Sequence, residues 1–275
     1  LKEKIKKGGS MMNRLEGKTA IVTAASRGIG LAITKAYVEN GAKVYMAMRD
    51  SQKNRDLIAE LQQENPLYQA VYYNAFDFES YQPMIEEVIE KEGKIDILVN
   101  NFGHTDVQKD KTLTTGDSDA FFHILNVDVA SVYYTSKYTV EQMQKQDQGG
   151  SIVNISSIGG ITPDIARLAY TTSKAAINSL TKSIAVQYAR NQIRCNAILP
   201  GLVGTDSALQ NMDERFLSTF LKHVPLNRIA TPEDIAQAAV YLGSDESNFV
   251  TGELISVAGG FGKPTPIYGD YNQNQ

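Results

Sequence analysis

The stretch TAASRGIG, residues 23–30, lies between the apolar run TAIVT, residues 19–23, and a segment with the composition of a helix. Gly28 and Gly30 match the last two glycines of a pyrophosphate loop, where one lets the backbone approach a phosphate and the other lets the helix pack closely. The free N–H groups and the positive dipole end of such a helix favour an anion. Ala24 occupies the first glycine position, so the turn either avoids a positive φ or is strained. Taken alone, the stretch is compatible with a nucleotide site and with an ordinary strand-to-helix turn.

Short apolar runs rich in Val and Ile recur along the chain, at 19–23, 43–48, 69–73, 95–100, 151–156, 193–199 and 253–257. They do not alternate strictly between apolar and polar residues, which is typical of strands buried on both faces of a parallel sheet. The intervening segments are long enough for the crossover helices that parallel strands require. The sequence therefore predicts an α/β fold, with a single doubly wound Rossmann-type domain of about seven parallel strands flanked by helices.

The composition of the 275 residues is that of an ordinary globular protein, with 42% hydrophobic and 21% charged residues. No run approaches the ~18 apolar residues that span a membrane, and Cys195 alone cannot form an intrachain disulfide. We therefore expect a cytoplasmic protein without a membrane partner. Residues 1–14 carry a net charge of +4 within a total of −4, which leaves −8 on the body and argues against a nucleic-acid partner. We expect residues 1–14 to be a disordered leader or a cloning remnant, and residues 15–275 to form the domain.

The end of the second predicted strand, 43–48, bears on coenzyme choice. An NAD-selective site generally places a carboxylate there to bind the ribose 2′-hydroxyl. This chain instead has Met48 followed by Arg49, and Arg27 lies inside the glycine loop. Two guanidiniums that converge on one region suit a 2′-phosphate, although each could also be a solvated surface charge. Asp50 either weakens such a site or caps the next helix. The pattern favours NADP(H).

Two segments place a tyrosine and a lysine one helical turn apart: YTTSK, with Tyr170 and Lys174, and YYTSK, at 133–137. An ammonium beside a phenol favours the phenolate. Such a tyrosine can exchange a proton with a carbinol oxygen near neutral pH. The pair alone does not decide between the two segments.

Position in the predicted fold separates them. Ser157 lies thirteen residues before Tyr170, directly after the run 151–156, whereas the residue thirteen before Tyr133 is Ala120, inside a helical pattern. A hydroxyl at the end of a strand faces the crevice where ligands bind. We therefore predict that Tyr170 is the acid/base and that Tyr133 is a buried helix residue.

These motifs make the chain from about Leu15 to Phe261 resemble the short-chain dehydrogenase/reductases. TAASRGIG resembles the family's TGxxxGxG loop, NNFG at 100–103 its NNAG, and NAILPG at 196–201 its N-x-x-x-P-G turn. The resemblance implies hydride transfer between a nicotinamide and a carbonyl or secondary alcohol carbon. It also implies that Ser157 and Tyr170 bind the oxygen, that Lys174 also holds the nicotinamide ribose, and that the protein is a homotetramer.

The resemblance further implies that NADP(H) lies across the carboxyl edge of the sheet, with Asn100 supporting the central strands. The implied cofactor contacts are Ala24, Ser26, Arg27, Gly28, Ile29, Gly30, Arg49, Asn74, Ala75, Asn101, Phe102, Gly103, Tyr170, Lys174, Pro200, Gly201, Val203 and Thr205.

The chain departs from the family pattern at three places. Ala24 replaces the first glycine, and Asn74 stands where an adenine-contacting aspartate is usual; its amide keeps an acceptor and adds donors. The family's fourth catalytic residue is an asparagine that holds a water for the proton relay, and that position falls on Asp128. Asn126 lies two residues earlier, and residues i and i+2 do not share a helix face. We therefore prefer Asp128 for the relay and leave Asn126 as the alternative.

The substrate is predicted from the loop after Ser157 and from the segment 202–225, which has apolar residues at helical spacing and is expected to act as a lid. An apolar lid suits a bulky, rigid substrate. PDIARLAY, HVPLNR and VAGGFGKPTPIYGD resemble the bacterial bile-acid hydroxysteroid dehydrogenases of the 7α and 12α types, with the 7α type slightly preferred. Arg167, Lys222 or His223 could meet the carboxylate of a bile acid. The expected substrate contacts are Ser157, Ile158, Gly159, Leu202, Leu209, Met212 and Phe216.

Two other functions remain open at this point. One is a 3-oxoacyl-carrier-protein reductase or another short-chain carbonyl reductase, although the acidic body gives little support for binding an acidic carrier protein. The other is a non-catalytic NADP(H)-binding protein, which would be expected to lose Tyr170 or Lys174. The histidines, at 104, 123 and 223, lack metal-ligand spacing, so we predict no metal site.

Overall fold

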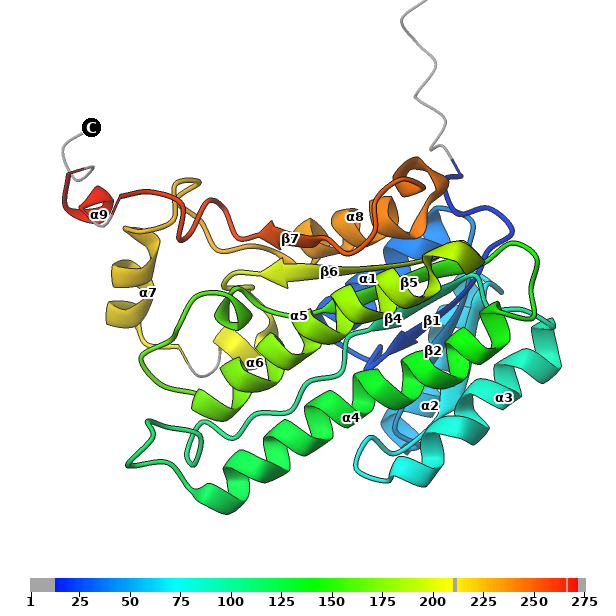
Figure 1. Cartoon of the computed structure of the whole chain (residues 1–275), viewed down its shortest axis with the longest axis horizontal. Coiled ribbons are helices and arrows are strands. Elements are labelled where there is room, and N and C mark those ends of the chain that lie inside the picture. Colours follow the sequence, from blue (N-terminus) through cyan, green and yellow to red (C-terminus); the bar gives the residue numbers. More distant parts are fainter. Residues whose placement is uncertain (1–12, 210–211, 266, 272–275) are drawn as a thin grey trace, which may run out of the picture.

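The computed structural model describes residues 13–209, 212–265 and 267–271. Seven parallel strands form one sheet in the order β3-β2-β1-β4-β5-β6-β7 (Figure 1). The strands are β1 (Thr19–Thr23), β2 (Lys43–Met48), β3 (Tyr68–Tyr72), β4 (Ile97–Asn100), β5 (Gly150–Ile155), β6 (Ile193–Pro200) and β7 (Leu254–Val257). The predicted doubly wound fold is confirmed, and each predicted run contributes one strand.

The order of the strands creates the place where a ligand binds. The chain runs outward from β1 to the β3 edge and then crosses back to β4, which pairs with the other side of β1. At this switch the loops after β1 and β4 leave the sheet in opposite directions and open a crevice at the carboxyl edge. Every residue of β1 and of β4 is buried, which explains their continuous apolar sequences.

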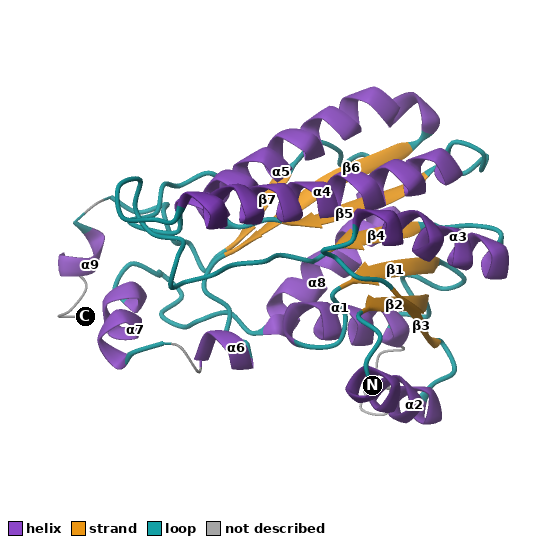
Figure 2. Ribbon diagram, turned by 90° about the horizontal axis from the view of Figure 1, so that it is seen from below, coloured by secondary structure: helices purple, strands orange, loops and turns teal. Residues whose placement is uncertain are grey.

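Helices cover both faces of the sheet (Figure 2). On one face α1 (Gly28–Glu39), α2 (Gln52–Glu64) and α8 (Pro232–Gly243) pack on one apolar core, and on the other face α3 (Tyr81–Glu92), α4 (Ser118–Met143) and α5 (Leu168–Tyr188) pack on a second. Successive residues of β1 pack into different cores: Ala20 and Val22 belong to the first, and Ile21 between them belongs to the second. Within the described ranges, every helix is too short or too polar to cross a lipid bilayer.

The remaining helices lie beyond the carboxyl edge. They are α6 (Asp206–Leu209), α7 (Glu214–Leu221) and α9 (Tyr268–Tyr271). Single 3₁₀ turns follow β3 (Phe78–Ser80) and β5 (Ile158–Gly160) at this edge, and two others precede β6 (Ala189–Asn191) and β7 (Asp245–Ser247) at the opposite edge. The segment expected to be a lid thus contains α6 and α7, and its residues 210–211 lie outside the described residues. Phe220 of α7 stacks on Phe261 with ring centroids 4.7 Å apart, so α7 rests on the C-terminal segment.

The predicted leader falls mostly outside the structure. Residues 1–12 are not among the described residues. Arg14, which we had placed in the leader, forms an ion pair with Glu246, and Leu15 is fully buried. The ion pair of Arg14 therefore lies one residue before Leu15, the predicted start of the domain.

Candidate active site

The glycine loop joins β1 to α1 in a strained conformation. Ala24 has a φ of 51°, which is left-handed and costs a residue with a Cβ about 1–2 kcal/mol. Of the two alternatives for this position, the strained one is found. Gly30 must be glycine, because a Cβ there would lie 2.4 Å from the carbonyl oxygen of Ala24 and 2.6 Å from Nδ2 of Asn101. Asn101 in turn donates to the carbonyl oxygens of Thr23 and Ala24, at 3.2 and 3.3 Å. The loop after β4 therefore holds the loop after β1 in shape.

A cavity of about 380 Å³ adjoins this loop, between the end of β2 and the turn after β3. Arg27 and Arg49 line it, as the sequence predicts, and Lys53 at the start of α2 adds a third cation. Among the described residues, none of these three cations takes part in an ion pair. The carboxylate of Asp50 does not pair with these cations, because it accepts two hydrogen bonds of 2.7 Å from Arg55. It does not cap α2 either, since Ser51 does so.

The opposite wall of the cavity is aromatic and polar. Asn74 and Ala75 line it, and Oδ1 of Asn74 accepts from the backbone N–H of Phe76 at 3.2 Å. Phe76, which sequence analysis missed, meets Phe102 edge to face with ring centroids 6.0 Å apart. The cavity is thus lined by the rings of Phe76 and Phe102 and the side-chain amide of Asn74 as well as by the three cations.

Asn100 ties the centre of the sheet to α4. Its Nδ2 donates to Oδ1 of Asn154 at 2.8 Å and to the hydroxyl of Ser136 at 3.1 Å, and its Oδ1 accepts from Thr135 at 2.6 Å. All four residues are buried. A buried polar group is stable only when its hydrogen bonds are made, so this network fixes β4, β5 and α4 to one another.

Ser157, Tyr170 and Lys174 lie at the carboxyl end of β5. Ser157 begins the 3₁₀ turn Ile158–Gly160, and its hydroxyl accepts from the N–H of Gly159 at 3.0 Å. Tyr170 is in the first turn of α5, and Lys174 is one turn further. The Lys174 ammonium is buried, donates to the carbonyl of Ile155 at 3.1 Å and lies 5.5 Å from the centroid of the Tyr170 ring.

The start of α5 depends on Asp110, which sequence analysis did not single out. The buried carboxylate of Asp110 accepts from the N–H groups of Ala169 and Tyr170, at 2.8 and 3.0 Å. Arg167, with a left-handed φ of 59°, pairs with Asp164, and its guanidinium lies 5.3 Å from the centroid of the Tyr170 ring. Arg167, considered above for a substrate carboxylate, already has an acidic partner within the chain.

Asp128 and Asn126 point to opposite environments, as their spacing on α4 predicts. Asp128 is fully buried; its carboxylate accepts from the backbone N–H of His104 at 2.7 Å and from the Ser173 hydroxyl at 2.9 Å. Burial raises the pKa of this carboxyl above its ordinary value, and the charge of Lys174 opposes the rise. Asn126 is exposed and lines a surface hollow, so it cannot reach the site around Lys174.

The prediction for Tyr133 is wrong. Tyr133 is 49% exposed, whereas Val132 and Thr135 beside it are buried. The i, i+4 pair with Lys137 reveals a shared helix face but not which face α4 turns toward the sheet.

The turn after β6 completes the crevice from the other side. Thr205 lies against the glycine loop, since a Cβ on Gly28 would be 3.2 Å from Cγ2 of Thr205. Likewise a Cβ on Gly103 would be 3.2 Å from Nζ of Lys174. The glycine loop, the NNFG segment and the P-G turn therefore meet at one place, together with Lys174.

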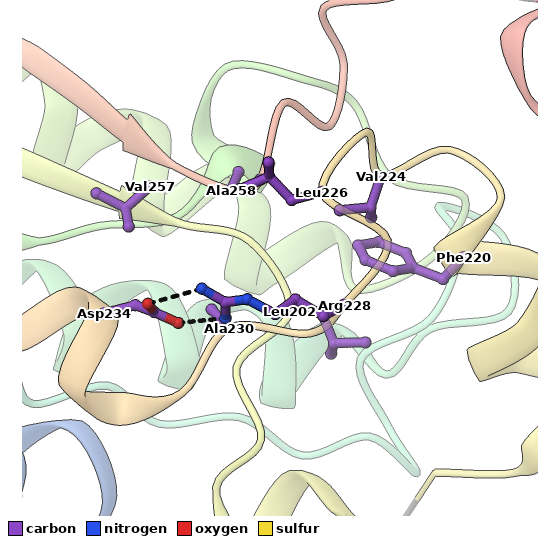
Figure 3. A pocket seen from close by; sticks show the side chains of 10 residues that line it. Leu202, Phe220, Val224, Leu226, Arg228, Ala230, Asp234, Val257 and Ala258 are labelled. Atoms are coloured by element: carbon purple, nitrogen blue, oxygen red, sulfur yellow. Dashed lines mark hydrogen bonds and ion pairs between the residues drawn. The ribbon is translucent and has the colours of Figure 1, made fainter.

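The expected substrate residues separate into two groups. Leu202 lines a pocket of about 140 Å³ with Phe220 and Val224, closed on one side by the ion pair of Arg228 and Asp234 (Figure 3). None of Ser157, Tyr170 and Lys174 lines this pocket. Leu209 and Phe216 are about half exposed, on α6 and α7, and Met212 between them is partly buried. The structure thus places Leu202 in a pocket that Ser157, Tyr170 and Lys174 do not line, and leaves Leu209 and Phe216 accessible.

Comparison with known proteins places this geometry among related enzymes. A family model described as enoyl-(acyl carrier protein) reductase matches residues 23–262. The chain is 54% identical over 260 residues to a 7α-hydroxysteroid dehydrogenase of Clostridium sardiniense, covering 94% of this chain and 99% of the relative. It is 46% identical to a 7α-hydroxysteroid dehydrogenase of Paraclostridium sordellii, covering 94% and 97%. The crystal structure of a short-chain type dehydrogenase/reductase from Mycobacterium marinum superposes with a TM-score of 0.83 at 30% identity, covering 93% of this chain and all of the other.

Proposed function

The chain belongs to the short-chain dehydrogenase/reductase family, and on this premise we propose that it is an NADP(H)-dependent 7α-hydroxysteroid dehydrogenase acting on bile acids. The observation that carries the reaction type is the meeting of Ser157, Tyr170 and buried Lys174 at the carboxyl end of β5, beside the glycine loop. The names of the relatives in Clostridium sardiniense and Paraclostridium sordellii support the steroid substrate.

The glycine loop, the NNFG segment and the turn after β6 would hold a nicotinamide coenzyme, which would supply the hydride chemistry at the alcohol or ketone carbon. The hydroxyls of Ser157 and Tyr170 bind the substrate oxygen, and Tyr170 takes or gives its proton. The Lys174 ammonium, 5.5 Å from the ring centroid of Tyr170, favours the phenolate. Its neighbour Gly103 lets the backbone approach it closely. We propose Asp128, which contacts Ser173 next to Lys174, as the fourth residue of the site.

The choice of NADP(H) over NAD(H) is supported by the charge of the coenzyme cavity. Arg27, Arg49 and Lys53 line it, and Arg55 engages the one nearby carboxylate, that of Asp50. Guanidinium groups bind a phosphate with paired hydrogen bonds. The residues that line the cavity therefore offer three cations to a 2′-phosphate and no carboxylate to a 2′-hydroxyl.

Two bile acids, assayed separately by reduction of NADP⁺, test the position of oxidation. Chenodeoxycholate has a 7α-hydroxyl and no 12α-hydroxyl, whereas deoxycholate has the reverse. We expect turnover of chenodeoxycholate alone. Turnover of deoxycholate alone would replace the 7α assignment with 12α, and turnover of neither, with NADPH still bound, would remove the steroid substrate.

We further propose a cytoplasmic homotetramer. Phe122, which is 66% exposed, lines a mostly apolar surface hollow with Leu125 and Val129 of α4 and Ala176 of α5. We take this contiguous apolar surface as a contact between subunits. Light scattering coupled to size-exclusion chromatography should give four times the 30.2 kDa of one chain; a monomer at micromolar concentration would contradict this part of the proposal.

A further inference from the structure

Asp128 places a buried carboxyl where the family pattern has an uncharged asparagine. Its two carboxylate oxygens both accept, one from the backbone N–H of His104 at 2.7 Å and the other from the hydroxyl of Ser173 at 2.9 Å. An ionised carboxylate only accepts hydrogen bonds. The Ser173 hydroxyl also lies 2.8 Å from the carbonyl oxygen of Tyr170 and has one proton for these two acceptors; when that proton points to Asp128, both partners donate and suit the ionised form.

These two hydrogen bonds hold the chain on both sides of Lys174. Ser173 immediately precedes Lys174 in α5. His104 follows Gly103, whose backbone lies so close to the ammonium that an added Cβ would be 3.2 Å from Nζ. The carbonyl of Ile155 accepts from the same ammonium at 3.1 Å. Asp128 therefore braces the two segments between which Lys174 is held.

Titratable groups face Asp128 from three elements: Lys174 on α5, His104 in the loop after β4 and Tyr81 on α3. Burial raises the pKa of Asp128, and among these groups Lys174 opposes the rise most strongly. A carboxyl whose pKa is higher in the folded protein than in the unfolded chain binds its proton more tightly in the folded state. It therefore favours folding only at low pH, where it is protonated. The ionised form therefore costs stability relative to the protonated form, so stability alone does not account for a carboxyl at this position.

We propose that Asp128 is a positioning residue that braces Lys174 and offsets its charge, so that the pH dependence of turnover is set by the pair and not by Lys174 alone. This inference rests on the proposed function, because Asp128 acts through Lys174 on proton transfer at Tyr170. A negative charge beside the ammonium weakens its stabilisation of a phenolate. Removal of that charge should move the pH profile of alcohol oxidation toward lower pH.

Asp128→Asn removes the charge and keeps the shape. The amide oxygen can accept from His104, and the amide nitrogen can donate to the hydroxyl of Ser173, which also bonds the carbonyl of Tyr170 at 2.8 Å. We expect the midpoint of kcat/KM against pH to fall by about one unit, a tenfold change in proton concentration. We expect the Tm at pH 7 to rise, with a gain that shrinks as the pH falls and the wild-type carboxyl takes up its proton.

Two further variants separate charge from bracing. Asp119→Asn removes the same charge from an exposed position in the first turn of α4 and should leave the midpoint unchanged. Asp128→Ala removes both hydrogen bonds and should lower the Tm and the turnover at every pH. An unchanged midpoint in Asp128→Asn would overturn the inference, and so would a Tm below that of the wild type, which marks a purely structural role.

The failure of this inference can be distinguished from the failure of the proposed function. The Tm comparison needs no substrate. If Tyr170→Phe keeps its turnover, the proposed acid/base is wrong. If Tyr170→Phe is inactive and Asp128→Asn keeps the wild-type midpoint, the proposed function stands and only the role of the Asp128 charge is wrong.

Discussion

The backbone N–H of Tyr170 donates to the buried carboxylate of Asp110 at 3.0 Å, across 60 residues of sequence. The same carboxylate accepts from the N–H of Ala169 at 2.8 Å. The N-cap residue of α5, Arg167, provides no side-chain cap, so Asp110 takes that place from the loop after β4. The position of the proposed acid/base therefore depends on a residue far from it in the chain.

Asp110→Ala should lower both stability and turnover. Two N–H groups at the start of α5 lose their partner, which costs about 1–3 kcal/mol for an unsatisfied buried donor. Displacement of Tyr170 should reduce kcat about tenfold or more, while the KM for NADP⁺ changes little. Asp110→Asn keeps one acceptor oxygen and should be intermediate in both properties. Thermal unfolding and steady-state kinetics test this, and a variant with unchanged Tm and kcat would show that α5 starts correctly without the cap.

Tyr170→Phe should abolish turnover while leaving NADPH binding nearly intact, because only the hydroxyl that moves the proton is lost. The chain supplies its own matched control in Tyr133, which also precedes a lysine by four residues but lies exposed on α4. Tyr133→Phe should keep wild-type kcat. NADPH fluorescence titration and the oxidation assay measure the two effects, and equal activity in both variants would refute the role of Tyr170.

Arg49→Asp should shift coenzyme preference toward NAD. The change removes a hydrogen-bonding partner of the 2′-phosphate and adds a carboxylate that can bind a 2′-hydroxyl. A hydrogen bond to a charged group contributes about 1.5–3 kcal/mol, so the NADP/NAD ratio of kcat/KM should fall by about ten- to a hundredfold. Arg190→Asp, a charge reversal at an exposed position after α5, should leave the ratio unchanged. An unmoved ratio in Arg49→Asp would remove Arg49 from the 2′-phosphate site.

The fold could be predicted because strands buried on both faces leave continuous apolar runs, which are visible without tertiary information. The glycine loop and Ser157 could be placed for the same reason, since both directly follow such runs. Asp128 could be assigned from its position in the family pattern, and helix geometry added only that Asn126, two residues away, faces elsewhere.

Other residues of the site could not be predicted, because the sequence around them carries no motif. Asp110 acts on Ala169 and Tyr170 through folding alone, and its own surroundings resemble any polar loop. Lys53 enters the coenzyme cavity because α2 starts there, and Phe76 because the turn after β3 bends back toward Phe102. In each case the contact depends on the placement of a second element that the sequence around the residue does not encode.

Asp234 should make stability depend on acid pH. Two hydrogen bonds from Arg228, of 2.6 and 2.9 Å, lower the pKa of Asp234 to about 2 (Figure 3). A depressed carboxyl stabilises the folded state above its unfolded value of about 3.9 and loses that contribution as the pH falls toward its folded value. The pair is partly exposed, so solvent screening limits its contribution to about 1 kcal/mol.

Asp234→Asn should therefore reduce the free energy of unfolding by about 1 kcal/mol at pH 7, and the difference from the wild type should narrow as the pH falls from 4 toward 2. Denaturant unfolding at pH 7, 4 and 3 measures this. Asp119→Asn, without such a partner among the described ion pairs, should show no comparable difference. A difference that is the same at all three pH values would mean that helix capping through Thr231, and not the ion pair, carries the effect.

Ala24→Gly should stabilise the protein without changing its activity. Relief of the left-handed strain gains about 1–2 kcal/mol, and the greater entropy loss of glycine on folding offsets about 0.5–1 kcal/mol of it. A net gain of this size raises the Tm of a domain of this length by roughly 2–4 °C per kcal/mol. The backbone carbonyl that Asn101 holds stays in place, so the KM for NADP⁺ should not move. Ala25→Gly, at a buried neighbour without a positive φ, should lower the Tm instead; if Ala24→Gly lowers it too, the loop conformation is not under strain at this residue.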